Sequence, residues 1–262
     1  MIILQEGMWH MINPMDLSEK IILVTGASSG IGRVTAIQLS KLGGRVVLVA
    51  RNKVKLNETV DMMEGRGHTV YSFDLIQIEK IEELIRQIIL ENGALNGLVH
   101  CAGIAPMRPL GLTKADFLHN VMLINFYSFV ELVRCVSKKK NYQIGASFIG
   151  ISSTSSRIGD KSKVAYCASK AALDSAVRCM AKELAEKGIR VNTVMPGFVK
   201  TGMYTDYMRE YSNASDAKKI LARQYIGITE PEEIANAVAY LLSDSAKTIT
   251  GSSFLVDGGS LS

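Results

Sequence analysis

Cysteine, proline and long apolar runs are scarce in this sequence. Its 262 residues include 4 Cys and 5 Pro. The cysteines have neither C-x-x-C spacing nor the density of a disulfide scaffold, which predicts small core residues in a reducing compartment: Cys101, Cys135, Cys167 and Cys179. No apolar stretch reaches the ~20 residues of a membrane span, and residues 1–19 lack the basic and apolar regions of an export signal. We therefore expect a cytoplasmic protein without a membrane anchor.

The sequence also has no strong excess of positive or negative residues. The formal net charge is +5, from 30 Lys+Arg against 25 Asp+Glu spread along the chain. No basic stripe interleaved with aromatic residues occurs, so we expect neither a nucleic-acid nor a membrane partner. The sequence lacks linkers, repeats and low-complexity stretches, and its 47% hydrophobic residues suffice for one large core. We predict a single domain over residues 20–262 behind an extension at 1–19.

Short apolar runs alternate with longer periodic segments along this domain. The runs occupy residues 21–25, 45–50, 69–73, 95–100, 146–151, 189–194 and 252–256. Each is apolar on both faces, as in buried parallel strands, and the segments between them, such as 30–42, 77–92, 115–139 and 165–187, have helical periodicity. Repeated units of this kind predict an α/β fold: a Rossmann-type doubly wound sheet of about seven parallel strands with helices on both faces.

Ligands of such sheets bind beyond the carboxyl ends of the strands, so the residues after each strand are candidates for the site. After the first strand comes TGASSGIG, with glycines at 26, 30 and 32 in a turn that opens a helix. Glycine lets the backbone approach a pyrophosphate, and the first amides of the helix donate to it. A tight turn requires glycine in any case, but the flanking strand and helix favour a dinucleotide site.

The residues after the second strand bear on the choice of dinucleotide. Sites for NAD usually carry an acidic residue here, whereas an arginine accommodates the 2′-phosphate of NADP. This chain has Arg51 and Asn52, and no acidic residue until Glu58. We predict NADP(H) as the cofactor; the alternative is that Arg51 is a solvated residue at a helix start.

Later strands are followed by further candidates. Asp74 either meets the adenine or caps the next helix with Gln77. Gly103 lets the chain pass close to a cofactor, the serines of SSTSS follow the fifth strand, and a Pro-Gly turn before Thr201 presents backbone groups to a flat ring.

Tyr166 and Lys170 lie four residues apart in a segment of helical periodicity, so both are expected on one helix face. An unperturbed tyrosine has a pKa near ~10. The charge of Lys170 would lower that pKa by favouring the phenolate, which suits proton exchange at neutral pH. Taken alone, the pair could equally be a solvated lysine beside a half-buried tyrosine.

From about Lys20 to Gly259 the chain resembles the compact, single-domain branch of the short-chain dehydrogenase/reductase family. The resemblance rests on G-x-x-x-G-x-G in the glycine turn and on residues in family order at family-like intervals: Asp74, Ala102–Gly103, Asn125, Ser153, Tyr166, Lys170, Pro196–Gly197 and Thr201. It implies hydride transfer between a nicotinamide and a carbonyl or secondary alcohol.

The resemblance also implies a role for each residue of a catalytic set. Tyr166 is the general acid in reduction and the general base in oxidation. Lys170 assists it and holds the nicotinamide ribose, Ser153 binds the substrate oxygen, and Asn125 binds a water that links Lys170 to solvent. Ser152 is the competing assignment for the serine. Ser153 could instead cap a helix, and Asn125 could satisfy helix backbone.

The cofactor-binding residues follow in the same way, and we predict no metal site. The cofactor set is Gly26, Ser28, Ser29, Gly30, Ile31, Gly32, Arg51, Asn52, Asp74, Leu75, Cys101, Ala102, Gly103, Tyr166, Lys170, Pro196, Gly197, Val199 and Thr201. Two features depart from the family pattern. His100 and Cys101 stand where relatives usually have Asn-Asn, and Ser29 stands where NADP-preferring relatives often have a basic residue.

The sequence constrains the identity of the substrate less than that of the cofactor. The chain end resembles that of 3-oxoacyl-[acyl-carrier-protein] reductases, which favours 3-oxoacyl reduction; a basic run at 138–140 with Lys187 could then meet an acidic carrier. Sugar, steroid or polyol dehydrogenases are alternatives, and a non-catalytic NADP(H)-binding regulator is an alternative of another class. A sugar-nucleotide epimerase or dehydratase shares the Tyr-to-Lys spacing, but such enzymes are usually longer than this chain and space their glycines differently.

The segment 198–228 is the expected substrate lid, because it gathers apolar and aromatic residues: Met203, Tyr204, Tyr207, Met208, Tyr211 and Tyr225. The same residues could instead pack a subunit interface. A capping box at Thr229 and Glu232 is expected to start the next helix. The resemblance implies a homotetramer or homodimer, with the long apolar helices and the last strand as interfaces.

Overall fold

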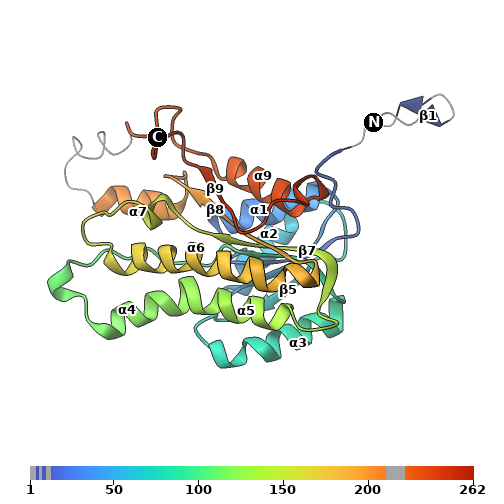
Figure 1. Ribbon diagram of the computed structural model, residues 1–262, viewed down its shortest axis with the longest axis horizontal. Coiled ribbons are helices and arrows are strands. Elements are labelled where there is room, and N and C mark those ends of the chain that lie inside the picture. The colour runs from blue at the N-terminus through green and yellow to red at the C-terminus, as the bar shows by residue number, and fades with distance from the viewer. Residues whose placement is uncertain (1–3, 6–7, 10–12, 211–221) are drawn as a thin grey trace.

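A computed structural model describes residues 4–5, 8–9, 13–210 and 222–262 of the chain (Figure 1). Tyr211, one of the residues assigned to the lid, lies outside these ranges. The first described element is a small antiparallel pair, β1 (Leu4–Gln5) and β2 (Met8–Trp9).

Seven strands form one parallel sheet, which confirms the predicted fold class. They are β3 (Ile21–Thr25), β4 (Arg45–Ala50), β5 (Thr69–Ser72), β6 (Leu95–His100), β7 (Tyr142–Ile151), β8 (Arg190–Pro196) and β9 (Ser253–Val256). Their order is β5-β4-β3-β6-β7-β8-β9. The order reverses direction at β3, so the crevice between β3 and β6 is the place where this fold binds ligands.

Helices cover both faces of the sheet (Figure 1). They are α1 (Gly30–Lys41), α2 (Lys53–Asp61), α3 (Ile81–Asn92), α4 (Ala115–Met122), α5 (Ser128–Val136), α6 (Val164–Leu184), α7 (Gly202–Glu210) and α9 (Pro231–Leu242). Neighbouring residues of a strand serve opposite faces. Leu23 packs in the core cluster of α3, α5 and α6, whereas Ile22 and Val24 pack in the cluster of α1 and α9.

The helix expected over 115–139 is interrupted. Between α4 and α5 lies a π-helical turn, Leu123–Tyr127. Single π-helical turns inside α-helices occur frequently at functional sites, and this one carries Asn125. The helix expected over 77–92 likewise begins with a 3₁₀ turn, Ile78–Lys80, before α3.

The ends of the domain also differ in detail from the expectations. Leu17, which the sequence assigns to the extension, is fully buried, and its N–H donates to Leu42 O at 2.8 Å. The capping box of α9 lies one residue later than expected, because Glu233 accepts from the N–H of Glu230. Thr229 pairs instead with Val199 in an isolated parallel bridge.

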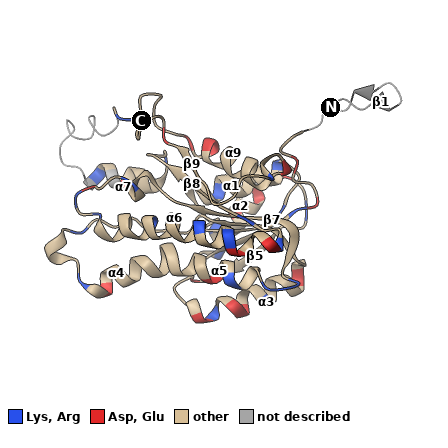
Figure 2. Ribbon diagram, viewed as in Figure 1, with Lys and Arg blue, Asp and Glu red and all other residues tan. Residues whose placement is uncertain are grey.

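No helix among the described residues combines the length and apolar character needed to cross a membrane. The ribbon in Figure 2 shows positions of both basic and acidic residues scattered over the helices.

Candidate active site

The glycine turn between β3 and α1 is built for close backbone packing. Gly26 has φ +68°, and a Cβ on it would lie 2.7 Å from Ala102 N. A Cβ on Gly32 would lie 2.3 Å from Gly26 O. Any larger residue would displace the turn from the end of β6, so this part of the chain needs glycine at both positions.

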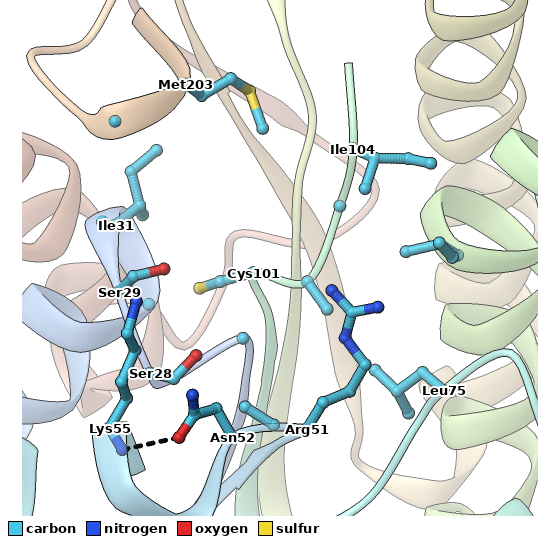
Figure 3. A pocket seen from close by; sticks show the side chains of 18 of the residues that line it. Ser28, Ser29, Ile31, Arg51, Asn52, Lys55, Leu75, Cys101, Ile104 and Met203 are labelled. Atoms are coloured by element: carbon cyan, nitrogen blue, oxygen red, sulfur yellow. Dashed lines mark hydrogen bonds between the residues drawn. The ribbon is translucent and has the colours of Figure 1, made fainter. Parts of the chain in front are cut away.

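The turn forms one wall of a cavity of about 510 Å³ at the carboxyl edge of the sheet (Figure 3). Many of the residues assigned to the cofactor line it: Gly26, Ser28, Ser29, Gly30, Ile31, Gly32, Arg51, Asn52, Asp74, Leu75, Cys101, Ala102, Gly103 and Thr201. The cavity also has lining residues outside the predicted cofactor set: Ala50, Lys55, Phe73, Ile104, Ile124, Gly202 and Met203, of which Met203 was expected in the substrate lid.

The first turn of α1 offers an anion site to this cavity. Ser29 is the N-cap residue, with extended backbone, and its side chain makes no capping hydrogen bond. The first turn contains no acidic residue. Free amides and the positive end of the helix dipole therefore face a cavity lined by glycine, an arrangement that fits a diphosphate.

The end of β4 supplies positive charge to the cavity. Arg51 and Lys55 both line it, on either side of Asn52, which caps α2 by accepting from Lys55 N–H at 3.0 Å (Figure 3). Glu58, the nearest following acidic residue, pairs with Arg33 at 3.1 Å. Arg33 in turn donates to Ser28 O at 2.8 Å, which ties the glycine turn to α2.

The N-cap residues of the 3₁₀ turn Ile78–Lys80 and of α3 are Gln77 and Lys80, so Asp74 does not cap the helix as expected. Asp74 follows β5. It lines the cavity, and its carboxylate accepts from Ile76 N–H at 3.2 Å while its carbonyl accepts from Gln77 N–H at 3.1 Å. The carboxylate therefore shapes the turn into the following 3₁₀ segment.

Ser153, Tyr166 and Lys170 meet at the carboxyl end of β7. Ser153 is hydrogen-bonded to Tyr166, which distinguishes it from Ser152, whose hydroxyl is buried without a partner in the described part of the chain. Lys170 Nζ lies 5.8 Å from the Tyr166 ring centroid and donates to Ile151 O at 2.7 Å. Ser153 Oγ also accepts from Ser155 N–H at 3.1 Å.

The expected lowering of the Tyr166 pKa is wrong for this structure. Burial raises the pKa of the Tyr166 phenol, the hydrogen bond with Ser153 offsets part of that rise, and the charges of Cys167 and Asp160 add to it. Burial also lowers the pKa of Lys170 to about 8, and the charge of Asp174 offsets part of that fall. The spacing of the pair says nothing about burial, and burial has the largest effect on both groups.

Asn125 clamps the chain that leaves β6. Its side chain accepts from Ile104 N–H and donates to Ile104 O, both at 2.9 Å, and donates to Ser169 Oγ at 2.9 Å. These bonds join the π-helical turn, the loop after β6 and α6. Both Nδ2 hydrogens are thus donated to protein groups, and Oδ1 accepts one hydrogen bond and keeps a second lone pair.

His100, the last residue of β6, joins the π-helical turn to the end of β3. Its Nε2 lies 3.2 Å from Ile124 O, and because a carbonyl only accepts, Nε2 carries the proton. Its Nδ1 then accepts from the Thr25 hydroxyl at 2.9 Å, at the end of β3. Burial, with the charge of Lys170, lowers the pKa of His100 to about 3, so the ring is neutral. His100 therefore holds the central strands against the π-helical turn.

Gly103 brings the cavity and the catalytic set together. It lines the cavity, and a Cβ on it would lie 3.5 Å from Lys170 Nζ and 3.3 Å from Asn125 Oδ1. Five residues of the predicted cofactor set fall outside the cavity lining: Tyr166, Lys170, Pro196, Gly197 and Val199. Of these, Val199 is buried in the core, and Gly197 N–H donates to Val256 O at 3.1 Å.

Comparison with known proteins agrees with this geometry. A family model described as enoyl-(acyl carrier protein) reductase matches residues 26–260. The chain is 36% identical to L-xylulose reductase of Caenorhabditis elegans over 93% of its length and 96% of the relative's. The chain belongs to the short-chain dehydrogenase/reductase family. It is also 36% identical to a 3-oxoacyl-[acyl-carrier-protein] reductase of Rickettsia conorii, over 94% and 99% of the two chains.

Solved structures of this family superpose closely on the chain. A dehydrogenase/reductase from Sinorhizobium meliloti matches with a TM-score of 0.86 at 31% identity, over 95% and 98% of the two chains. A 7α-hydroxysteroid dehydrogenase complexed with NADH and 7-oxo glycochenodeoxycholic acid matches with a TM-score of 0.87 at 28% identity, over the same shares. The protein is thus an NAD(P)-dependent oxidoreductase, and the non-catalytic regulator is set aside.

Proposed function

We propose that this dehydrogenase/reductase uses NADPH to reduce a carbonyl group, with Tyr166 as the proton donor. The position of Gly103 carries the proposal. It lines the dinucleotide cavity, and the space beside its Cα is bounded by Lys170 Nζ and Asn125 Oδ1. The cofactor-sized cavity and the acid–base residues therefore share one wall.

The side chains divide the work of the reaction. The glycine turn and the amides of α1 would hold the diphosphate, and the bound nicotinamide would supply the hydride. Ser153 orients the substrate oxygen beside the Tyr166 hydroxyl, to which it is already hydrogen-bonded. Tyr166 gives its proton to that oxygen in reduction and takes it back in oxidation. Lys170, fixed by Ile151 O, keeps a positive charge beside the phenol.

NADP(H) is the preferred form because the end of β4 presents cations and no carboxylate to the cavity. Arg51 and Lys55 line it, while Glu58 is engaged by Arg33. A structure described as an NAD(P)-dependent gluconate 5-dehydrogenase from Beutenbergia cavernae, with NADP bound at low occupancy, matches the chain with a TM-score of 0.87 at 28% identity, over 95% and 99% of the two chains.

A binding titration tests the cofactor preference. Arg51→Ala should weaken NADPH binding by about 10- to 100-fold, the range expected for losing a hydrogen bond to a charged group. NADH binding should change little, because NADH has no 2′-phosphate. Arg66→Ala, which removes an exposed arginine that does not line the cavity, is the matched control. Tighter binding of NADH than NADPH by the wild type would contradict the proposal.

A turnover assay tests the acid–base role. Tyr166→Phe should lower kcat by about 100- to 10,000-fold, the usual contribution of a positioned proton donor, while NADPH binding is retained. Tyr142→Phe is the matched control, because Tyr142 is the first residue of β7 and lies at the end of that strand away from Ser153. Full activity of Tyr166→Phe would assign the proton to another group.

Two substrate classes merit testing first, because the relatives include an L-xylulose reductase and 3-oxoacyl-[acyl-carrier-protein] reductases. The lysines suggested for carrier docking give the second class little support. Lys138 pairs with Glu82, and Lys187 donates to Ser137 O. Lys187 lies beyond the end of α6, and by the ~1.5 Å rise per helical residue the α6 segment from Tyr166 to Leu184 alone spans ~27 Å. Oxidation of NADPH with a ketose, a 3-oxoacyl thioester and a diketone would rank the classes.

A further inference from the structure

We propose that Lys163 is a second cation of the active site, which stabilises the phenolate form of Tyr166 together with Lys170. Lys163 is the N-cap residue of α6, three positions before Tyr166. Sequence reasoning did not single it out. The inference rests on the acid–base role proposed for Tyr166 and adds a positioning residue that acts on that group through its charge.

The geometry brings Lys163 to the ring of Tyr166 as closely as Lys170. Each Nζ lies 5.8 Å from the ring centroid. Lys163 is a buried residue, with 6% of its surface exposed. A charge in such surroundings is screened weakly, so it acts on its neighbours more strongly than a surface lysine would.

Asp160 explains why a second cation is needed. Its charge raises the pKa of Tyr166, as does that of Cys167 one residue along α6. Lys163 Nζ lies 3.9 Å from the Asp160 carboxylate, close enough to offset its field at the phenol. Lys163 N–H also donates to Asp160 O at 3.3 Å, so the loop before α6 holds both charges in place.

Lys170 alone is a weak source of charge here. Burial brings its pKa down to about 8, and the charge of Asp174 offsets only part of that fall. As the pH rises above that value, Lys170 loses its charge while Tyr166 is still protonated. Lys163 places a second amino group at the same distance from the ring, so the field at the phenol does not come from Lys170 alone.

The experiment measures the ionisation of Tyr166 directly. Near-ultraviolet absorbance of phenolate is titrated in the full-length protein, and the Tyr166 signal is isolated by subtracting the titration of Tyr166→Phe. Lys163→Met should raise the pKa of Tyr166 by about one unit, at the lower end of the effect of a neighbouring opposite charge. Lys163→Arg, which keeps the charge, should restore the wild-type value to within a few tenths of a unit.

Two further variants separate charge from packing. Asp160→Asn should move the pKa of Tyr166 the opposite way, downward, and it remains informative if Lys163→Met fails to fold. Lys161→Met removes the same charge from an exposed neighbour in the same loop and should leave the pKa unchanged. An unchanged pKa in Lys163→Met, or an equal rise in Lys161→Met or Lys163→Arg, would overturn the proposal.

The pH profile of alcohol oxidation provides the second readout. In Lys163→Met the pH of half-maximal rate should rise with the phenol pKa, so the rate at a fixed lower pH falls about tenfold per unit. The phenolate titration and the turnover assay together distinguish failure of the Lys163 proposal from failure of the proposed function. A phenolate shift without turnover on any substrate counts against the proposed function and for Lys163, whereas normal turnover with no shift counts against Lys163 alone.

Discussion

His100 makes the stability of the protein sensitive to acid. The ring is buried and neutral, with its pKa lowered to about 3 by burial, while an unfolded chain binds a proton near the ordinary value of 6.5. Below pH 6.5 the unfolded state therefore binds more protons than the folded state, and the free energy of unfolding falls as the pH falls. We expect a loss of about 3 kcal/mol from this residue between pH 7 and pH 4. Urea unfolding at several pH values measures it.

His100→Asn is the matched variant, because asparagine keeps a donor and an acceptor but does not titrate. Its unfolding free energy should depend less on pH over the same range, whatever its value at neutral pH. Identical pH dependence in the two proteins would show that His100 does not carry the effect.

For single residues, the sequence predicted which side chains form the site better than it predicted their pKa shifts. The intervals among Ser153, Tyr166 and Lys170 identified side chains that do converge at the end of β7. The sign of the Tyr166 shift was wrong, because desolvation depends on the packing around the ring. Lys163 was missed for the same reason: its burial beside Tyr166 is a tertiary property that no local pattern encodes.

The strand–turn–helix element that holds the diphosphate allows a sharp test at Gly32. A Cβ there would lie 2.3 Å from Gly26 O, a backbone atom that cannot give way without moving the turn. We expect Gly32→Ala to weaken NADPH binding by at least tenfold and to lower the free energy of unfolding by about 1 to 3 kcal/mol, as overpacking usually does. Calorimetric titration and urea unfolding measure the two effects.

Gly111→Ala is the control for this variant. No heavy atom lies within 4 Å of a Cβ at that position, and Gly111 has no positive φ. The control should bind NADPH like the wild type. If Gly32→Ala did so too, the turn would not be the diphosphate site.

Elements were predictable from the sequence wherever periodicity is uniform. The residues of α1 and of the central strands follow their patterns closely, but the π-helical turn Leu123–Tyr127 was read as part of one long helix. The π-helical turn is only five residues long, too short for its own periodicity to stand out in the sequence. What marks the turn is tertiary: Asn125 is bonded to Ile104, and Ile124 O faces His100.

On the scale of the whole molecule, the parallel sheet and its two layers of helices followed from the alternation of apolar runs, because each run must be covered on both faces. The last strand breaks this rule. Phe254 and Leu255 of β9 point to opposite faces and are 36% and 40% exposed. β9 pairs with β8 and ends the sheet, so its outer backbone groups are unpaired within the sheet.

An open, apolar edge strand is normally protected, and a second copy of the chain is the cover we predict here. The wild type should then sediment at a mass of at least twice 28.6 kDa. Charging the edge with Phe254→Lys or with Leu255→Glu, each alone, should shift sedimentation toward a smaller species, because the interface would then bury a charge in place of an apolar side chain. Ile144→Lys changes a side chain that is 90% exposed at the start of β7 and should leave the mass unaltered. A wild type that sediments as a single chain at micromolar concentration would mean that β9 is exposed in solution and that its apolar side chains serve another contact.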